Sequence, residues 1–208
     1  MIYSPDHNFL MLKNIKVGGT SLEVELSNVL PDNAIVTTIN PENIKHIPRN
    51  YDGFYNHMPY SEINKKINLL GVMAYTIVRN PYTTVLSDFF YKLHINNYLI
   101  KWNLYTEDEK NKRLDEYFNS DMFLKSTKYI YMDNDKIHVE KFIKYELGIE
   151  DQVNSILTNH SIKNIKINTF EKKYKPSDFT VQNTFRQADL DKIYNEWSWE
   201  FTMFGYDK

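Results

Sequence analysis

The sequence predicts an α/β fold in which a central parallel β-sheet is flanked by helices. Short apolar segments alternate with segments of helical periodicity along the chain, which is typical of strand–helix–strand units. The chain has 208 residues, of which 42% are hydrophobic, and a net charge of −2. This composition can bury a core and differs from that of a disordered chain. Because the length suits one domain, we predict a single domain over residues 1–208.

Four segments are predicted to be strands, because each is short, mostly apolar and bounded by turn residues. They are Phe9–Ile15, Ala34–Ile39, Val72–Val78 and Val139–Tyr145. Ligands bind at the carboxyl ends of the strands in parallel sheets of this kind. The turns that follow the first and the third strand therefore become the candidate site.

Six segments have apolar residues at helical spacing. They are Leu22–Leu30, Ser61–Leu69, Pro81–Tyr98, Thr106–Phe118, Glu150–Leu157 and Ala188–Phe201. Ser61 is the expected N-cap of the second. The charged fourth helix is expected to face solvent, whereas Trp197, Phe201 and Phe204 are expected in the core. Asn40–Gly53 and the basic run Lys172–Lys175 are expected to be loops.

Composition excludes several classes of function. The chain has no cysteine, so disulfides, thiolate catalysis and cysteine-ligated metals are ruled out. Its nearly balanced charge disfavours a dedicated nucleic-acid-binding protein, which usually carries a cationic surplus. The N-terminal residues do not form a signal peptide, and no apolar stretch is long enough to span a membrane. We therefore expect a cytoplasmic protein.

The turn after the first strand has residues that suit an anion. Its members are Lys16, Val17, Gly18, Gly19, Thr20 and Ser21, here called the glycine loop. Glycines let the backbone approach a ligand closely, and the helix that follows directs unpaired N–H groups toward the turn. The lysine adds a full charge, and the two hydroxyl groups add donors. A plain strand–turn–helix with a hydroxyl N-cap is the structural alternative.

The nucleotide P-loop is the nearest rival motif for this turn. It requires Gly-x-x-x-x-Gly-Lys followed by Ser or Thr. Here the lysine precedes the glycines, and no glycine stands four residues before them. The sequence therefore disfavours an ATPase or GTPase.

The turn after the third strand begins with Arg79. Pro81 then opens the next helix, and Ser87 lies in the second turn of that helix. A guanidinium group has a planar fork of donors that matches a phosphate. An arginine ion-paired at a helix start, with an exposed serine, is the structural alternative.

The glycine loop resembles the 5′-phosphosulfate-binding loop of sulfotransferases that use 3′-phosphoadenosine 5′-phosphosulfate (PAPS). The likeness is closest to the Golgi-type carbohydrate branch, with its heparan sulfate-like O-sulfotransferases, where the loop typically runs Lys-Thr-Gly-Gly-Thr-Ser. Val17 departs from that pattern. The segment from Arg79 to Ser87 resembles the 3′-phosphate site of the same family. Weaker likeness extends to Asn56–Tyr60, Phe142–Glu146 and Phe201–Tyr206, whereas the region 97–136 has no counterpart.

The resemblance implies a P-loop-like sulfotransferase fold with PAPS as co-substrate and no metal. Lys16 would be the catalytic lysine, the rest of the glycine loop would hold the phosphosulfate, and Arg79 and Ser87 would hold the 3′-phosphate. His57 would be the base that accepts the proton of an acceptor hydroxyl, with Glu62 as the alternative. The acceptor implied by this branch is a saccharide.

Two other hypotheses stay open at this stage. In the first, the chain is a kinase-like protein that binds nucleotide phosphates. In the second, it is a degenerate sulfotransferase fold retained for binding. Metal-independent activity would distinguish the expected enzyme from the kinase-like protein. Turnover would distinguish it from the binding module.

Overall fold

The computed structural model describes residues 1–39, 45–167 and 179–208, which group into two compact units. The first unit contains the described residues of 1–79 and 127–172, and the second contains those of 80–126 and 173–208. The expected single domain depends on how these units are joined, and it stays a prediction. The expected loop Asn40–Gly53 lies partly outside the described residues, and the basic run Lys172–Lys175 lies wholly outside them.

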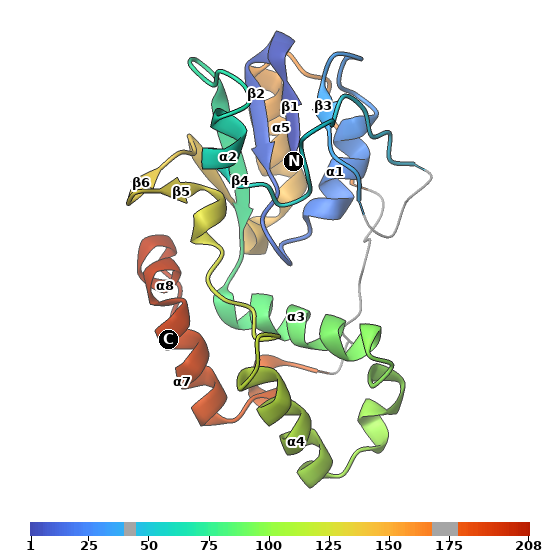
Figure 1. Cartoon of the computed structure of the whole chain (residues 1–208), viewed down its shortest axis with the longest axis vertical. Helices are drawn as coiled ribbons and strands as arrows, with labels where there is room; N and C mark the ends of the chain where they lie inside the picture. The colour runs from blue at the N-terminus through green and yellow to red at the C-terminus, as the bar shows by residue number, and fades with distance from the viewer. Residues whose placement is uncertain (40–44, 168–178) are drawn as a thin grey trace. The chain divides into compact units, whose positions relative to one another are not determined.

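The first unit is a mixed α/β structure built on a five-stranded sheet in the order β3-β1-β2-β4-β7 (Figure 1). The strands are β1 (Ile2–Ser4), β2 (Phe9–Leu12), β3 (Ile35–Val36), β4 (Met73–Val78) and β7 (Lys141–Lys144). β4 pairs in parallel with both β2 and β7. The four predicted strands are therefore present, with shorter bounds than expected.

The prediction of a purely parallel sheet is wrong, because β1 runs antiparallel to both β2 and β3. The sequence analysis did not include this strand. A single 3₁₀ turn, Pro5–His7, joins β1 to β2 and ends at Asn8 in the left-handed conformation with φ 48°. So short a connection can join only antiparallel strands, since a parallel pair needs a long crossover. The sheet is therefore mixed.

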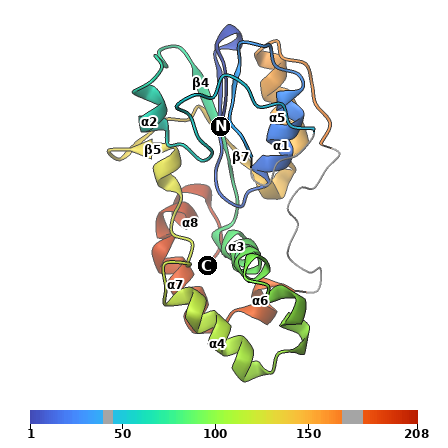
Figure 2. The same ribbon diagram turned by 45° about the vertical axis from the view of Figure 1, so that its right-hand side comes forward.

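Helices cover both faces of the sheet (Figure 2). On one face lie α1 (Gly19–Ser27) and α5 (Ile149–Asn159), which bury their apolar residues against the strands. The strand residues of this core alternate along β2 and β4, as the two-residue period of a strand requires; they include Phe9, Met11, Tyr75 and Ile77. On the other side lie α2 (Tyr60–Asn64) and the hairpin of β5 (Met132–Asp133) and β6 (Lys136–Ile137).

The start of α2 differs from the prediction. Pro59 is its N-cap, with an extended backbone at φ −65° and ψ 150°, and its carbonyl accepts the N–H of Glu62 at 3.1 Å. Ser61 is therefore a residue of the first turn and not the N-cap. The ring of Pro59 already sets the φ angle of the cap position, so the N-cap lies two residues earlier than the expected Ser61.

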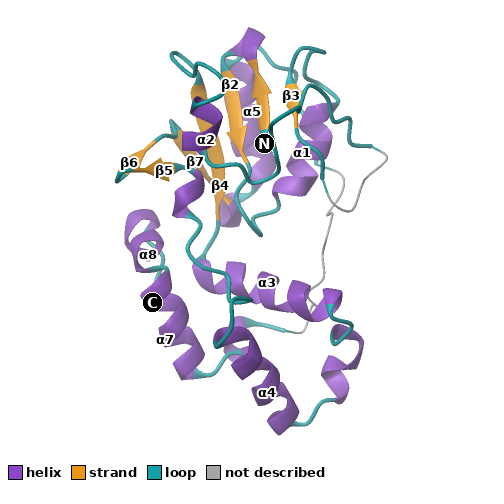
Figure 3. Cartoon of the chain, viewed as in Figure 1, coloured by secondary structure: helices purple, strands orange, loops and turns teal. Residues whose placement is uncertain are grey.

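The second unit contains helices and loops only, within its described residues (Figure 3). Its elements are α3 (Pro81–Ile95), η2 (Leu99–Leu104), α4 (Glu107–Phe118), α6 (Val181–Thr184), α7 (Gln187–Glu196) and α8 (Ser198–Phe204). Phe89 is at the centre of its aromatic core, with edge-to-face contacts to the rings of Trp102, Tyr117 and Phe185. Such contacts stabilise aromatic pairs by about 0.5–1.5 kcal/mol each beyond area burial.

Two helix predictions in the second unit need correction. α4 does not simply face solvent, because it buries Leu114, Tyr117 and Phe118. Its charges occupy the remaining positions, so the helix is amphipathic. The expected closing helix is divided into α7 and α8 at Trp197, where φ is −109° and ψ is 18°. The expected burial of Trp197, Phe201 and Phe204 is confirmed, at 3%, 3% and 6% exposed.

In the described part of the chain, no helix has both the length and the apolar character that a membrane crossing needs.

Candidate functional site

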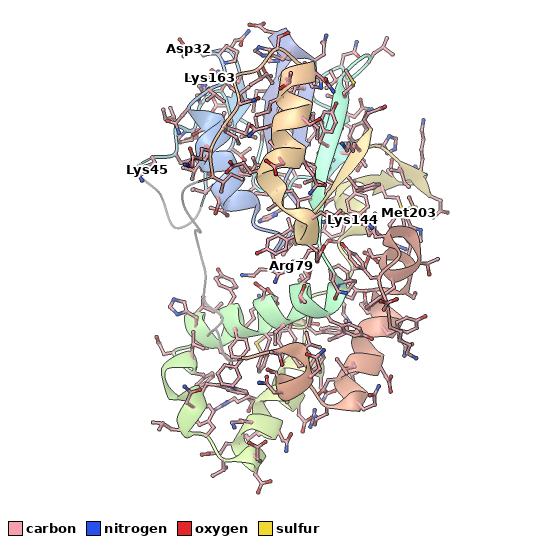
Figure 4. The ribbon with its side chains drawn as sticks, turned by 180° about the vertical axis from the view of Figure 1, so that it is seen from behind. Asp32, Lys45, Arg79, Lys144, Lys163 and Met203 are labelled. Carbon is pink, nitrogen blue, oxygen red and sulfur yellow. The ribbon has the colours of Figure 1, made fainter. Side chains whose placement is uncertain are left out.

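The structure brings the two predicted turns to one edge of the sheet. β2 and β4 are parallel neighbours with Leu12 opposite Thr76, so their carboxyl ends lie side by side. The glycine loop follows β2, and Arg79 follows β4 directly. Figure 4 shows Arg79 and Lys144, the last residue of β7, at this same end of the sheet.

The backbone of the glycine loop has two residues in the left-handed region. Lys16 has φ 58° and Gly18 has φ 79°. Gly18 is the N-cap of α1 and, as a glycine, has no side chain that could cap the helix. The N-terminus of α1 therefore lies at the loop, and helix N-termini are places where proteins bind anions.

The side chains of the glycine loop have different surroundings. Val17 is only 2% exposed and belongs to the hydrophobic core of the first unit, which anchors the middle of the loop. Lys16 and Thr20 are half-buried, and Ser21 is 6% exposed in the first turn of α1. Burial of Val17 also explains how an apolar residue is accommodated where the resemblance leads one to expect threonine or alanine.

Arg79 contacts the glycine loop directly. Its Nη1 donates a hydrogen bond to the carbonyl oxygen of Lys16, 3.1 Å away. Its guanidinium carbon also lies 4.4 Å from the centre of the Tyr145 ring, a cation–π geometry. The guanidinium is therefore held beside the loop from two directions.

Tyr145 is a site residue that the sequence analysis did not single out. It follows β7 directly, as the first residue of η4 (Tyr145–Leu147). Its ring contacts the glycine loop as well as Arg79, since a Cβ atom built on Gly18 would lie 3.2 Å from its Cε2. Ligands bind at the carboxyl ends of parallel strands, and the sequence analysis applied this rule only to the first and third predicted strands. Applied also to β7, which pairs in parallel with β4, the rule would have found Tyr145.

His57 lies beside the start of the same loop. Its Nδ1 is 3.0 Å from the carbonyl oxygen of Lys13, the residue that follows β2. A carbonyl can only accept, so Nδ1 carries the proton and Nε2 carries the lone pair. Burial, followed by the positive charge of Lys13, lowers the pKa of His57 to about 4. The imidazole is therefore neutral near pH 7, with Nε2 able to accept a proton.

Two other predicted residues have no contact with the glycine loop or Arg79 among those that the structure describes within the first unit. Glu62, the alternative base, accepts a hydrogen bond from the hydroxyl of Tyr55 at 2.6 Å, and this bond raises the pKa of Tyr55 to about 12. Ser87 is half-buried in α3 and belongs to the second unit. Its association with Arg79 stays a prediction.

The residues of this edge combine a helix N-terminus, a lysine, an arginine and a neutral histidine. The first three suit an anion, and the histidine suits a proton transfer. The comparisons with known proteins found no matching family model, no similar curated protein and no similar solved structure. Function is therefore inferred from the chemistry of these residues together with the motif resemblance.

We expect Gly18→Ala to destabilise the protein more than Gly71→Ala does. Both glycines have φ 79°, so both substitutions carry the left-handed backbone penalty of about 1–2 kcal/mol. A Cβ at Gly18 would also meet Ile149 Cδ1 at 3.3 Å and the Tyr145 ring, whereas nothing lies within 4 Å of a Cβ at Gly71. Urea unfolding of the two variants measures the difference, and equal losses would show that the loop is not packed as described.

We expect folding stability to fall as the pH drops from about 6.5 to 4. The pKa of His57 is about 4 in the folded protein and 6.5 in a free side chain, so the unfolded chain takes up the proton first. The full difference between the two pKa values corresponds to a loss of roughly 3 kcal/mol in the free energy of unfolding. Urea unfolding at several pH values should show a smaller decline for His57→Asn. An identical pH dependence in that variant would exclude a buried neutral His57; His46, whose pKa is also lowered by burial, is common to both proteins.

Proposed function

We propose that this protein transfers a sulfuryl group from PAPS to a hydroxyl of a saccharide acceptor. The single observation that carries the proposal is the contact of Arg79 with the backbone of Lys16. PAPS has a 5′-phosphosulfate and a 3′-phosphate, and a protein that binds both needs two anion sites held at a fixed separation. Arg79, at the end of its strand, is hydrogen-bonded to the glycine loop, and the two together supply such a pair of sites.

The surrounding residues support a P-loop-like sulfotransferase fold for the first unit. The glycine loop comes between a strand and a helix, and the arginine ends the neighbouring parallel strand. The contact between Arg79 and the glycine loop supports the proposal that one ligand binds to both. A mixed sheet is compatible with this assignment, because β2 and β4, the strands that lead into the two turns, are parallel to each other.

The reaction would be an in-line displacement at sulfur. The acceptor oxygen forms a bond to sulfur while the bond from sulfur to the bridging oxygen of the 5′-phosphate breaks. The electron pair of that bond leaves with adenosine 3′,5′-bisphosphate, where Lys16 and the N-terminus of α1 stabilise the developing negative charge. The acceptor proton passes to Nε2 of His57, and the bound anions favour the resulting imidazolium.

We expect Arg79→Met to weaken the binding of adenosine 3′,5′-bisphosphate by about tenfold or more, since charge-assisted hydrogen bonds contribute about 1.5–3 kcal/mol each. Lys163→Met is the matched control, because it removes one positive charge from an exposed residue at the far end of the sheet (Figure 4). Isothermal titration calorimetry with the bisphosphate, ATP and GTP measures both effects. Equal bisphosphate affinity in the two variants, or tighter binding of ATP, would contradict the proposal.

We expect Lys16→Ala to reduce sulfuryl transfer by about a hundredfold or more, the usual effect of removing one donor to a developing anion. The fold should be retained, because Lys16 is half-buried at the surface of the loop. Formation of sulfated product from PAPS and an unsulfated polysaccharide measures the rate, with Lys163→Ala as the control. A wild-type rate in Lys16→Ala would remove the catalytic role of this lysine.

A further inference from the structure

A buried ionic cluster lies directly beneath the glycine loop. Glu23 of α1 is 2% exposed, and its carboxylate is ion-paired with the Nζ of Lys13 and with the Met1 amine, the latter at 2.9 Å. Lys13 is itself only 4% exposed. Opposing charges lower the pKa of Glu23 to about 2, against the effect of burial, which by itself raises it. The Glu23 carboxylate is therefore ionised throughout the neutral range.

Buried ions of this kind are costly to maintain. Removing a charged group from water costs several kcal/mol, and well-packed apolar residues of similar volume often serve stability as well or better. The position of the cluster suggests what the ions do here. Lys13 precedes the glycine loop and supplies the carbonyl to which His57 is hydrogen-bonded.

The backbone around Lys13 is restrained on several sides. Its side-chain stem packs beneath α1, since a Cβ at Gly19 would lie 3.3 Å from Lys13 Cγ. The end of that side chain is held by Glu23. The next residue, Asn14, donates from Nδ2 to the carbonyl of Ile77 in β4 at 3.2 Å. The Lys13 carbonyl is thus presented to His57 from a rigid segment.

We propose that the Lys13–Glu23 pair is a positioning element for the base. It fixes the carbonyl that accepts the Nδ1–H hydrogen bond of His57, and so leaves the lone pair on Nε2. This inference rests on the proposed function. Neither residue touches the reacting atoms. Without a fixed acceptor at Nδ1, the imidazole can place its proton on Nε2, and that tautomer cannot accept a proton from the substrate there.

The pair also determines the charges that His57 experiences. Lys13 and the Met1 amine disfavour the imidazolium, whereas Glu23 favours it. Removing the charge of Lys13 should therefore raise the pKa of His57, and removing the charge of Glu23 should lower it further. These two changes follow from charge alone, so the positioning role is tested by the tautomer of His57.

The test is the tautomer of His57 in the ligand-free protein, read from the imidazole nitrogen shifts by ¹⁵N NMR. We expect Nδ1–H in the wild type. Lys13→Met should increase the Nε2–H fraction and raise the pKa of His57. His160 is the internal control, because its Nδ1 faces the carbonyl of His7 at 2.7 Å and its Nε2 faces the Tyr75 hydroxyl at 2.8 Å. Its signals should not change.

A wild-type His57 protonated on Nε2 would overturn the proposal, as would a Lys13→Met variant with an unchanged His57 tautomer and pKa. The wild-type measurement needs no variant, so poor folding of Lys13→Met does not remove the test. The double variant Lys13→Met/Glu23→Gln removes both charges together and avoids leaving either partner alone. We expect it to lower kcat about tenfold or more while the KM for PAPS stays within about twofold.

The two proposals can fail separately. Absence of sulfuryl transfer by a wild type that has the Nδ1–H tautomer would remove the proposed function alone. Transfer by a protein whose His57 carries its proton on Nε2 would remove the positioning role alone.

Discussion

The parallel pairing of β2 with β4 is the constraint on which the candidate site depends. It places Leu12 beside Thr76, so the chain leaves both strands at the same edge and in the same direction. The hydrogen bond from Arg79 to the Lys16 carbonyl is possible only because of this register. A shift of one residue would turn the side chains of β4 to the opposite faces of the sheet. The apolar alternation of Tyr75 and Ile77 toward the core excludes that shift.

Burial disfavours the charged form of both ionisable groups next to the loop, and their charged neighbours decide whether each stays charged. Glu23 stays charged because two cations face it, whereas His57 stays neutral because burial and the charge of Lys13 both disfavour its protonation. One residue, Lys13, contributes to both outcomes. Its ammonium group pairs with Glu23, and its carbonyl faces His57. The first unit thus contains a charged carboxylate and a neutral histidine that both contact Lys13.

The second unit is stabilised in a different way. Its described residues form helices around Phe89 and neighbouring aromatic rings. Polar contacts orient the helices around this core. Arg186 pairs with both Asp115 and Asp189, and the indole N–H of Trp197 donates to the carbonyl of Leu124 at 3.1 Å.

The sequence by itself determined the four strands that carry the sheet, most of the helices and the positions of the two turns. These follow from local patterns: apolar periodicity, proline at Pro81 and glycine at Gly18 and Gly19. Tertiary structure alone decided the direction of β1, the contacts of Tyr145 with Arg79 and the glycine loop, and the tautomer of His57. Each depends on a partner distant in the sequence, as in the contact between His57 and Lys13, and a one-dimensional pattern does not record which distant residues meet.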